Sequence, residues 1–422
     1  MMELRECNGT IYYMDASFEE IAERYDTPFY LYDLDAVRER AAVVKQVFGD
    51  SIELLYAVKA NPNQDLLQGM LDCVDGLDIA STGELRRALA ADYRPETISF
   101  AGPGKTVAEL REAIRHGVGI ISVESMRELR DLRAIAEEEG VRVKVTIRIN
   151  PGQPVKEFAV KMGGKASQFG IDEEDVGEAA DYLREHENYF DILGIHIYAG
   201  TQCLSEDALA RGLAETLRIA SEVRQRHGIE CRVINIGGGF GVSYYEEGKG
   251  LDLGLLARLY HEEFDRYRRT TGSNPRIFLE LGRYLVAEAG IYVARVVSEK
   301  RSRGEQFYIL DGGMNHHLAA SGNLGATLRK NYLVKNLSNP RRELTKCNLV
   351  GPLCTPLDLM GKGVMVESPA IGDLIGFLNS GSYGYSASPL HFLGHEPPKE
   401  IICDQDTMKV GKANNPAIGI DR

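Results

Sequence analysis

The sequence predicts an α/β fold, in which a closed barrel of parallel strands with helical crossovers, the (β/α)₈ architecture, is joined to an all-β domain. Three observations predict it. Short β-branched runs alternate with amphipathic stretches from about residue 52 to 283, the runs number eight, and the alternation stops after them. Because periodicity does not report whether a sheet closes, an open doubly wound sheet is the alternative.

The barrel elements can be assigned from their periodicity. Each strand is expected as a short apolar run, and each helix has apolar residues on one face. The strand candidates are IELLYAVK, GLDIAS, TISFAGPG, IISVES, VKVTIRIN, ILGIHIYAG, RVINIGGG and RIFLELG. The helices expected between them are Glu84–Ala91, Val107–His116, Ser125–Gly140, Glu173–Glu187, Asp207–His227 and Leu253–Thr271. The barrel is therefore predicted at residues 35–283.

The remaining residues, 1–34 and 284–422, are predicted to form the β domain. Strand-like runs separated by turns follow the barrel, with few helical patterns. These runs are IYVARVVSEKR, QFYILDGG, ELTKCNLVGPLC, VMVESPAIGDLIGFLN and EIICDQDTMKV. The early runs GTIYYMD and PFYLYD are candidates for the same domain. No low-complexity linker separates the two parts, so we expect them to pack closely.

The composition is typical of a globular enzyme. The 422 residues are 44% hydrophobic and 26% charged. A net charge of −13 counts against nucleic acid as a partner, because phosphate binding relies on a surplus of Lys and Arg. There is no apolar run of membrane-spanning length and no apolar signal segment at the N-terminus. The seven cysteines lack metal-ligand or disulfide spacing, so we expect a cytoplasmic protein with reduced thiols and no metal.

A lysine, a glycine-rich loop and a carboxylate stand at the ends of three predicted strands. Lys59 would lie at the catalytic mouth of the barrel, where desolvation could remove its proton; a lysine that merely reaches solvent is the alternative. Gly238 and Gly239 follow the seventh strand, where barrels often bind phosphate, although a tight structural turn is an equally good explanation. Glu280 ends the eighth strand and needs a cationic partner, either a pyridinium nitrogen or an arginine such as Arg283.

These three features match the three handles of pyridoxal phosphate, and the chain resembles the fold-type III pyridoxal-phosphate decarboxylases, which include diaminopimelate, ornithine and arginine decarboxylases. The motifs that carry the resemblance are, in order, YAVKAN, DIASTGEL, GPGK, RIN, HIYAGTQ, NIGGGFG, ELGRYLV, DGGMN, GPLCTPLD and GSYGYS. It runs from PFYLYD to SPLHFLGH. It implies an alanine-racemase-like barrel that binds pyridoxal 5′-phosphate, a decarboxylase activity, and a homodimer with shared active sites.

The resemblance also implies a role for individual residues. Lys59 would hold the cofactor as a Schiff base, and Glu280 would pair with the ring nitrogen. Cys354 would cross the dimer interface and protonate Cα. The phosphate would be surrounded by Thr201, Gly238, Gly239, Gly282, Arg283 and Tyr383. The floor of the pocket would be lined by Asp78, Glu84 and Arg148. The substrate would meet Arg283, Arg329, Cys354, Thr355 and Tyr383.

The chain departs from the family pattern in two places. Tyr198 fills the position of the histidine that stacks on the cofactor ring, and His196 lies two residues earlier on the same strand face, so we expect both at the cofactor. Thr355 and Pro356 follow Cys354, where diaminopimelate and ornithine decarboxylases carry the carboxylate that binds the distal ammonium of their substrates. The likeness is therefore greatest to members of the butirosin (antibiotic) and siderophore pathways, which act on amino acids already attached to a larger group.

This resemblance implies an aminoacyl conjugate as substrate, first of all L-glutamyl acyl-carrier protein, with a siderophore-pathway conjugate or free diaminopimelate as alternatives. An acidic carrier protein would need a basic docking patch, although a solvated charged face is the simpler explanation for the run Arg329, Lys330, Lys335, Arg341, Arg342 and Lys346. A racemase would lack the GPLCTPLD segment, and a single-domain cofactor-handling protein would lack the β domain. An inactive regulator should have lost Lys59 or the phosphate glycines.

Overall fold

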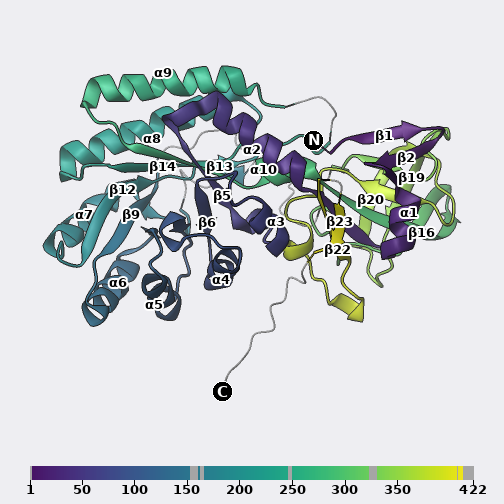
Figure 1. Ribbon diagram of the computed structural model, residues 1–422, viewed down its shortest axis with the longest axis horizontal. Coiled ribbons are helices and arrows are strands. Elements are labelled where there is room, and N and C mark those ends of the chain that lie inside the picture. Colours follow the sequence, from purple (N-terminus) through teal and green to yellow (C-terminus); the bar gives the residue numbers. More distant parts are fainter. Residues whose placement is uncertain are drawn as a thin grey trace.

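The computed structural model describes residues 2–152, 160–161, 166–245, 250–322, 330–405 and 407–411. These residues form two lobes, with the helices α4–α9 around the parallel strands at one end and the strands β16–β22 at the other (Figure 1). Within these ranges no helix combines the length and the apolar character needed to cross a membrane.

Eight parallel strands close into a barrel. In pairing order they are β5 (Glu53–Ala57), β6 (Gly76–Ile79), β7 (Ile98–Phe100), β8 (Ile120–Val123), β9 (Val143–Asn150), β12 (Phe190–His196), β14 (Val233–Gly238) and β15 (Arg276–Leu281). The pairing of β8 with β9 and of β15 with β5 completes the ring. This closure confirms the predicted barrel and excludes the open sheet.

The six predicted helices lie close to their predicted bounds, and two further helices of the barrel, at Leu34–Phe48 and Gln64–Gly69, were not predicted. The helices of the barrel are α2 (Leu34–Phe48), α3 (Gln64–Gly69), α4 (Thr82–Ala90), α5 (Val107–His116), α6 (Met126–Glu139), α7 (Val176–Glu185), α8 (Glu206–His227) and α9 (Leu253–Thr271). Helix α5 shows why the bounds could be predicted. Thr106 and Glu109 form a reciprocal capping box at its start, and Gly117 ends it in the left-handed conformation at φ 76°.

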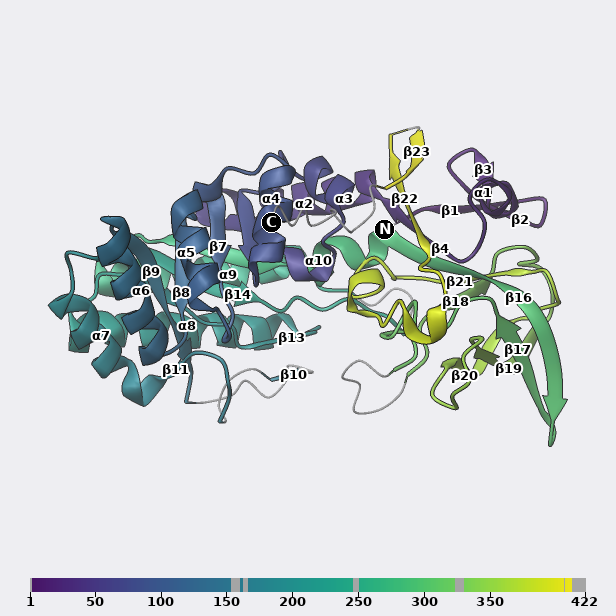
Figure 2. The same ribbon diagram turned by 90° about the horizontal axis from the view of Figure 1, so that it is seen from below.

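The β domain is organised around the long strand β16 (Gly290–Ser302), which runs from the junction of the lobes to the far end of the molecule (Figure 2). The other strands of its sheet are β4 (Phe29–Asp33), β17 (Glu305–Leu310), β18 (Val334–Asn336), β19 (Leu344–Val350), β20 (Leu359–Glu367), β21 (Leu374–Phe377), β22 (Lys399–Asp404) and β23 (Thr407–Val410). The early run PFYLYD therefore joins this sheet as β4, which pairs with β16 and β22.

The other early run, GTIYYMD, forms its own small sheet. Strand β2 (Thr10–Tyr13) pairs with β1 (Leu4–Cys7) and β3 (Ala16–Ser17), and helix α1 (Phe18–Tyr25) follows. The side chains of this N-terminal unit still pack in one hydrophobic cluster with β4 and β16. It is therefore an attachment to the β domain rather than an extension of its main sheet.

The β domain covers the mouth of the barrel. The backbone N–H of Tyr383 donates to the carbonyl of Ala60, and the Asn61 amide donates to the carbonyl of Gly381, at 2.8 and 3.0 Å. Gly290, where β16 begins, approaches Gly381 so closely that a Cβ on it would lie 2.4 Å from the Gly381 Cα. The segment GSYGYS is thereby held against the residues that follow β5.

The interior of the barrel changes character along its axis. Near the amino ends of the strands lies a small apolar cluster of Leu55, Ile120, Leu193, Val233 and Phe278. Two residues further along β8 and β15, on the same inward face, stand Ser122 and Glu280. The barrel is thus filled by hydrocarbon at one end and by polar groups at the other, which is the end where βα loops build active sites.

Candidate active site

Lys59 follows β5 at the polar mouth of the barrel and is paired with the end of the next strand. Its Nζ donates to Asp78 Oδ2 at 2.9 Å. Burial opposes the charge on this amine, but the carboxylates of Asp78 and Glu280 outweigh burial and raise the pKa of Lys59. Desolvation does act to lower this pKa, as expected from the sequence, but the net shift is upward because β6 brings a carboxylate into direct contact with the ammonium.

Asp78, Ser122, His196 and Glu280 form one polar layer across the barrel, which we call the polar layer. They come from β6, β8, β12 and β15, which are alternate strands, as in the four-residue layers that fill such barrels. Each residue is at most 4% exposed. Such layers are ordinarily built of Val, Ile and Leu, so four buried polar side chains at the mouth indicate a site for a ligand.

Glu280 is held at both carboxylate oxygens. The Asn235 amide donates to Oε1 at 2.5 Å, and His196 Nε2 lies 3.5 Å from Oε2. Burial alone would raise its pKa, but His196, Lys59 and Asn235 lower the pKa of Glu280 to about 2. Burial and the neighbouring Glu280 charge raise the pKa of Asp78. These neighbours therefore hold Glu280 in its ionised form at neutral pH.

Arg283 begins α10 (Arg283–Val286) beside the polar layer and is fixed by two tyrosines. Its Nη1 donates to the Tyr244 hydroxyl at 2.8 Å, and its guanidinium lies over the rings of Tyr383 and Tyr244, 4.5 and 5.4 Å from their centroids. The Nε atom is buried and has no hydrogen-bond partner among the described residues. A buried donor without a partner is costly, so it marks a place for an acceptor such as a phosphate oxygen.

Glu280 faces a cavity, and half of the predicted site residues line it. Those that line it are Lys59, Tyr198, Thr201, Gly239, Glu280, Gly282, Arg283 and Tyr383. Gly238 is not among them, and a Cβ there would lie 1.8 Å from the Glu280 carbonyl oxygen. The close approach of β14 to β15 explains that glycine, a structural reason other than the tight turn considered from the sequence.

Arg148 and Glu84 are engaged with protein groups of their own. Arg148 pairs with Glu124 at 2.7 Å and lies over the ring of Phe169. Glu84 accepts a hydrogen bond from the Ala80 N–H at 2.6 Å. Burial raises the pKa of Glu84 to about 7, although the Ala80 hydrogen bond and the Lys59 charge act in the opposite direction. Glu84 thus senses the charge on Lys59, whereas Arg148 braces the barrel mouth.

The structure does not bring Cys354 into this cavity. The thiol is exposed, and neither Cys354 nor Thr355 is among the residues that line the cavity. The loop that carries them is anchored by Asp358, whose carboxylate accepts from the backbone N–H groups of Leu353 and Met314 at 2.8 and 2.7 Å. Arg329, the other residue expected at the substrate, lies outside the described residues.

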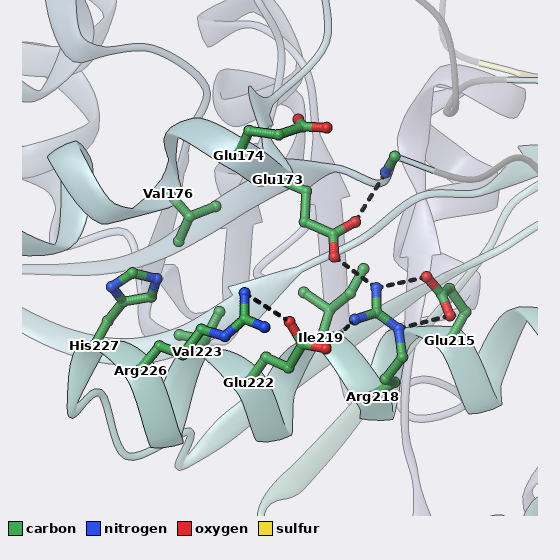
Figure 3. Close-up of a pocket in the computed structure, with 11 residues that line it drawn as sticks. Glu173, Glu174, Val176, Glu215, Arg218, Ile219, Glu222, Val223, Arg226 and His227 are labelled. Atoms are coloured by element: carbon green, nitrogen blue, oxygen red, sulfur yellow. Dashed lines mark hydrogen bonds and ion pairs between the residues drawn. The ribbon is translucent and has the colours of Figure 1, made fainter.

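A larger hollow lies on the outside of the barrel, between α7 and α8 (Figure 3). Arg218 pairs there with Glu173, Glu215 and Glu222, so its guanidinium is already engaged by protein carboxylates. In the part of the chain that the structure describes, no cluster of His, Cys, Asp and Glu is arranged to hold a metal ion. The polar layer and its cavity are therefore the better candidate for chemistry.

Three supporting residues were not predicted from the sequence. Ser122 and Asn235 sit inside otherwise apolar strands, and that pattern could have found them, because a buried polar side chain needs a partner. Tyr244, which binds Arg283, lies in the loop after β14, where no periodicity singles it out. Its role depends on a contact between distant segments.

Comparison with known proteins gives a consistent result. A family model described as "Pyridoxal-dependent decarboxylase, pyridoxal binding domain" matches residues 34–287. The L-glutamyl-(BtrI acyl-carrier protein) decarboxylase of Niallia circulans is 40% identical, covering 92% of this chain and 91% of that protein. The 2-((L-alanin-3-ylcarbamoyl)methyl)-2-hydroxybutanedioate decarboxylase of Staphylococcus aureus is 30% identical, covering 91% and 96%. The crystal structure of diaminopimelate decarboxylase from Helicobacter pylori complexed with L-lysine is 29% identical, with a TM-score of 0.84 and coverage of 93% and 95%.

Proposed function

The chain belongs to the pyridoxal-dependent decarboxylases, and from that premise we propose which substrate it decarboxylates. The enzyme is a lyase that uses pyridoxal phosphate. We propose that it removes the α-carboxylate of an amino acid whose far end is joined to a larger group, with L-glutamyl acyl-carrier protein as the first candidate. One observation carries this proposal: Thr355 follows Cys354, where diamino-acid decarboxylases carry a carboxylate. The printed names of two relatives, which describe conjugated amino acids, support it.

The side chains around the cavity fit this cofactor. When bound, pyridoxal phosphate supplies an aldehyde that reacts with amines and a protonated ring that accepts the electron pair released as CO₂ leaves. Lys59 offers the amine, and the Arg283 Nε donor, which has no partner in the described chain, offers a contact for the phosphate. Glu280 faces the cavity as a charged carboxylate. A ring nitrogen that must keep its proton requires a negative charge of this kind beside it.

The contact between Lys59 and Asp78 gives the amine a proton acceptor. Lys59 must lose a proton from Nζ before it can act as a nucleophile. Asp78 Oδ2 already accepts a hydrogen bond from that atom, and burial raises the pKa of Asp78, which makes it a better proton acceptor than an exposed carboxylate. We propose that Asp78 both holds Lys59 in place and takes part in this proton transfer. The Tyr198 ring, 5.9 Å from Nζ to its centroid, forms a wall beside the amine.

We propose that Cys354 completes the site of a second copy of the chain. The thiol is exposed on the β domain and lies outside the cavity of its own barrel, so a Cα proton donor at this residue must act in another subunit. Two-fold pairing is the commonest assembly of soluble proteins and would provide two such sites. None of the seven cysteines forms a disulfide within the described residues, which supports the further proposal of a reducing, cytoplasmic compartment.

Mixing Lys59→Ala with Cys354→Ala protein is expected to restore activity. Each variant alone lacks one essential group in both of its sites, but a mixed dimer has one site with Lys59 and Cys354 intact. Random exchange of equal amounts makes half of the dimers mixed, so about a quarter of the wild-type activity should return. CO₂ release is the measurement, and differently tagged subunits report the exchange.

A control variant shows whether the loss of any exposed cysteine matters. Cys7→Ala changes another exposed cysteine of the same lobe and should keep full activity on its own, because it leaves both sites intact. Proven subunit exchange without recovered activity would contradict the shared site.

The enzyme is expected to prefer a substrate with a neutral far end. A free diamino acid brings a distal ammonium, and placing that charge beside Thr355 and Pro356 leaves it without a counterion. An unpaired charge that costs about 2–3 kcal/mol lowers kcat/KM by roughly 30- to 150-fold. CO₂ release should be compared for L-glutamyl carrier protein and for free diaminopimelate, ornithine and lysine. Efficient turnover of free diaminopimelate would return the chain to a role in lysine biosynthesis.

A reciprocal variant makes the substrate test independent of the choice of carrier. Thr355→Glu supplies the missing carboxylate and should raise kcat/KM for the free diamino acids while lowering it for the neutral conjugate. Thr355→Ser keeps a hydroxyl of the same kind and should change neither value. If both variants behave alike, residue 355 does not read the far end of the substrate.

Some residues of the basic run proposed for carrier docking are already paired with acidic residues of the same chain. Arg341 pairs with Glu6 and Arg342 with Asp373, so both guanidinium groups already have counterions. Lys330 lies 5.4 Å from the centroid of the Tyr245 ring. Lys335 and Lys346 make no ion pair among the described residues, and with Lys330 they are the positive charges we propose for an acidic carrier protein.

A further inference from the structure

His196 lies behind the cavity rather than on its wall. It ends β12 with 1% of its surface exposed and is not among the residues that line the cavity. Its Nδ1 lies 3.0 Å from the Ser122 hydroxyl, which in turn lies 2.9 Å from the Thr146 hydroxyl. The imidazole is therefore anchored from β8 and β9 and cannot reach a ligand directly.

The other ring nitrogen of His196 faces Glu280. Nε2 is buried, makes no hydrogen bond of normal geometry within the described chain, and lies 3.5 Å from Glu280 Oε2. When the Ser122 hydroxyl donates to Nδ1, a neutral imidazole carries its proton on Nε2, directed at that carboxylate. Catalytic hydrogen bonds are often this long in a protein without its ligand.

Four groups act on the Glu280 charge. Lys59, His196 and Asn235 favour the ionised form, while Asp78 disfavours it. A lysine engaged with the cofactor no longer offers a free ammonium, so its share of this stabilisation is lost in the working enzyme. His196 and Asn235 then remain to hold the carboxylate in its charged form against burial.

We propose that His196 is a positioning residue, which is held by Ser122 and in turn orients the Glu280 carboxylate and keeps it charged, without touching the cofactor. This inference rests on the proposed function, because it requires Glu280 to face the ring nitrogen of the cofactor. It replaces the role of direct cofactor contact that the resemblance implies for His196. The chain Thr146–Ser122–His196–Glu280 connects three residues of the polar layer, and together they support the proton on the ring nitrogen of the cofactor.

The test is to measure the protonation of the ring nitrogen itself. The full-length enzyme is loaded with pyridoxal phosphate labelled with ¹⁵N in the ring, and the nitrogen chemical shift is followed as pH rises. In His196→Asn the amide can reach Ser122 but not Glu280, so the midpoint for loss of the ring proton should fall by about one pH unit, a tenfold change in proton affinity. Ser122→Ala should lower it in the same direction by less.

Conservative rescue separates positioning from general packing. His196→Gln can place an N–H donor where Nε2 stands, and its midpoint should lie closer to wild type than that of His196→Asn. In a Glu280→Gln background, His196→Asn should add no further change, because its effect passes through the carboxylate. His261→Asn is the matched control, since His261 Nε2 lies 3.2 Å from the Phe48 carbonyl oxygen on the outside of the barrel, and it should leave the shift unchanged.

The possible failures can be told apart. A wild-type midpoint in both His196→Asn and Ser122→Ala overturns the inference and leaves the role of Glu280 intact. A ring nitrogen that is unprotonated in the wild type, or unaffected by Glu280→Gln, overturns the proposed role of Glu280 and this inference with it. Should His196→Asn fail to fold, Ser122→Ala, which removes only a hydroxyl, gives the decisive measurement.

Discussion

Replacing Lys59 with alanine should abolish decarboxylation while leaving the barrel folded. Lys59 is the one lysine among the described residues that line the cavity, so no neighbouring amine can take its place. Removing a nucleophile that forms the covalent link to its partner costs at least about a thousandfold in kcat. Single-turnover measurement of CO₂ release detects the residual rate, and circular dichroism confirms the fold.

Chemical labelling tests the same assignment without an assay of activity. Borohydride should fix the cofactor on Lys59 of the wild type, and peptide mapping should find no adduct in the variant. Lys105 is the informative competitor, because its side chain is buried at this end of the barrel, but its ammonium is paired with Glu128 at 2.9 Å. An adduct on Lys105 or any other lysine would overturn the assignment.

The loss of Lys59 should also change how stability depends on pH. Asp78 already has a raised pKa, and removal of the ammonium that lowers it raises it further. A carboxyl group whose pKa is higher in the folded than in the unfolded state binds its proton on folding, so its contribution is present at low pH and is lost as pH rises through the folded value. The midpoint temperature of thermal unfolding should therefore fall more with rising pH in Lys59→Ala than in the wild type.

Glu280→Gln should leave the enzyme folded and loaded with cofactor but slower by about a hundred- to a thousandfold in kcat. The amide cannot carry the negative charge that keeps a ring nitrogen protonated, so the electron pair released with CO₂ has no cationic acceptor. In the wild type, Asn235 and His196 each face a carboxylate oxygen of Glu280. The NH₂ group of the glutamine would replace one of these oxygens and place a donor against one of the two residues. Steady-state kinetics should show the defect in kcat rather than KM.

A structural role for Glu280 would give a different result. Gln has nearly the same volume and can still accept one hydrogen bond, so packing alone would be preserved. Near-normal turnover of Glu280→Gln would therefore show that the charge is dispensable. Asn235→Ala provides the comparison, because it removes one support of the carboxylate but keeps the charge, and it should be much less impaired.

The barrel could be predicted because its elements are encoded locally. Runs such as VKVTIRIN carry a buried strand in consecutive residues, and helix α5 has its own capping residues and terminal glycine. The ends of parallel strands meet at one mouth, so Lys59 and Glu280 could be placed there without coordinates. Closure of the sheet needed the structure, because it depends on the pairing of β15 with β5, the last and first strands of the barrel, which are far apart in sequence.

The parts that could not be predicted depend on distances between strands. Nothing in YAVKAN says that Asp78 contacts Lys59, so the net upward shift of the Lys59 pKa could not be predicted. The contact of His196 with Glu280 depends on the stagger of alternate strands, which periodicity does not report. The site at which Cys354 acts depends on a second chain. A single chain shows only that Cys354 does not line the cavity of its own barrel.

The polar layer has a consequence for the life of the protein in the cell. This barrel has an ammonium and two carboxylates at its mouth, and buried atoms of Asp78 and Arg283 find no hydrogen-bond partner within the described residues. A ligand that satisfies them only in the native state adds RT ln(1 + [L]/Kd) to the free energy of unfolding. Chains made in a cell rich in vitamin B6 should therefore escape proteolysis longer than chains made in a starved one, so nutrition sets the amount of the enzyme as well as its activity.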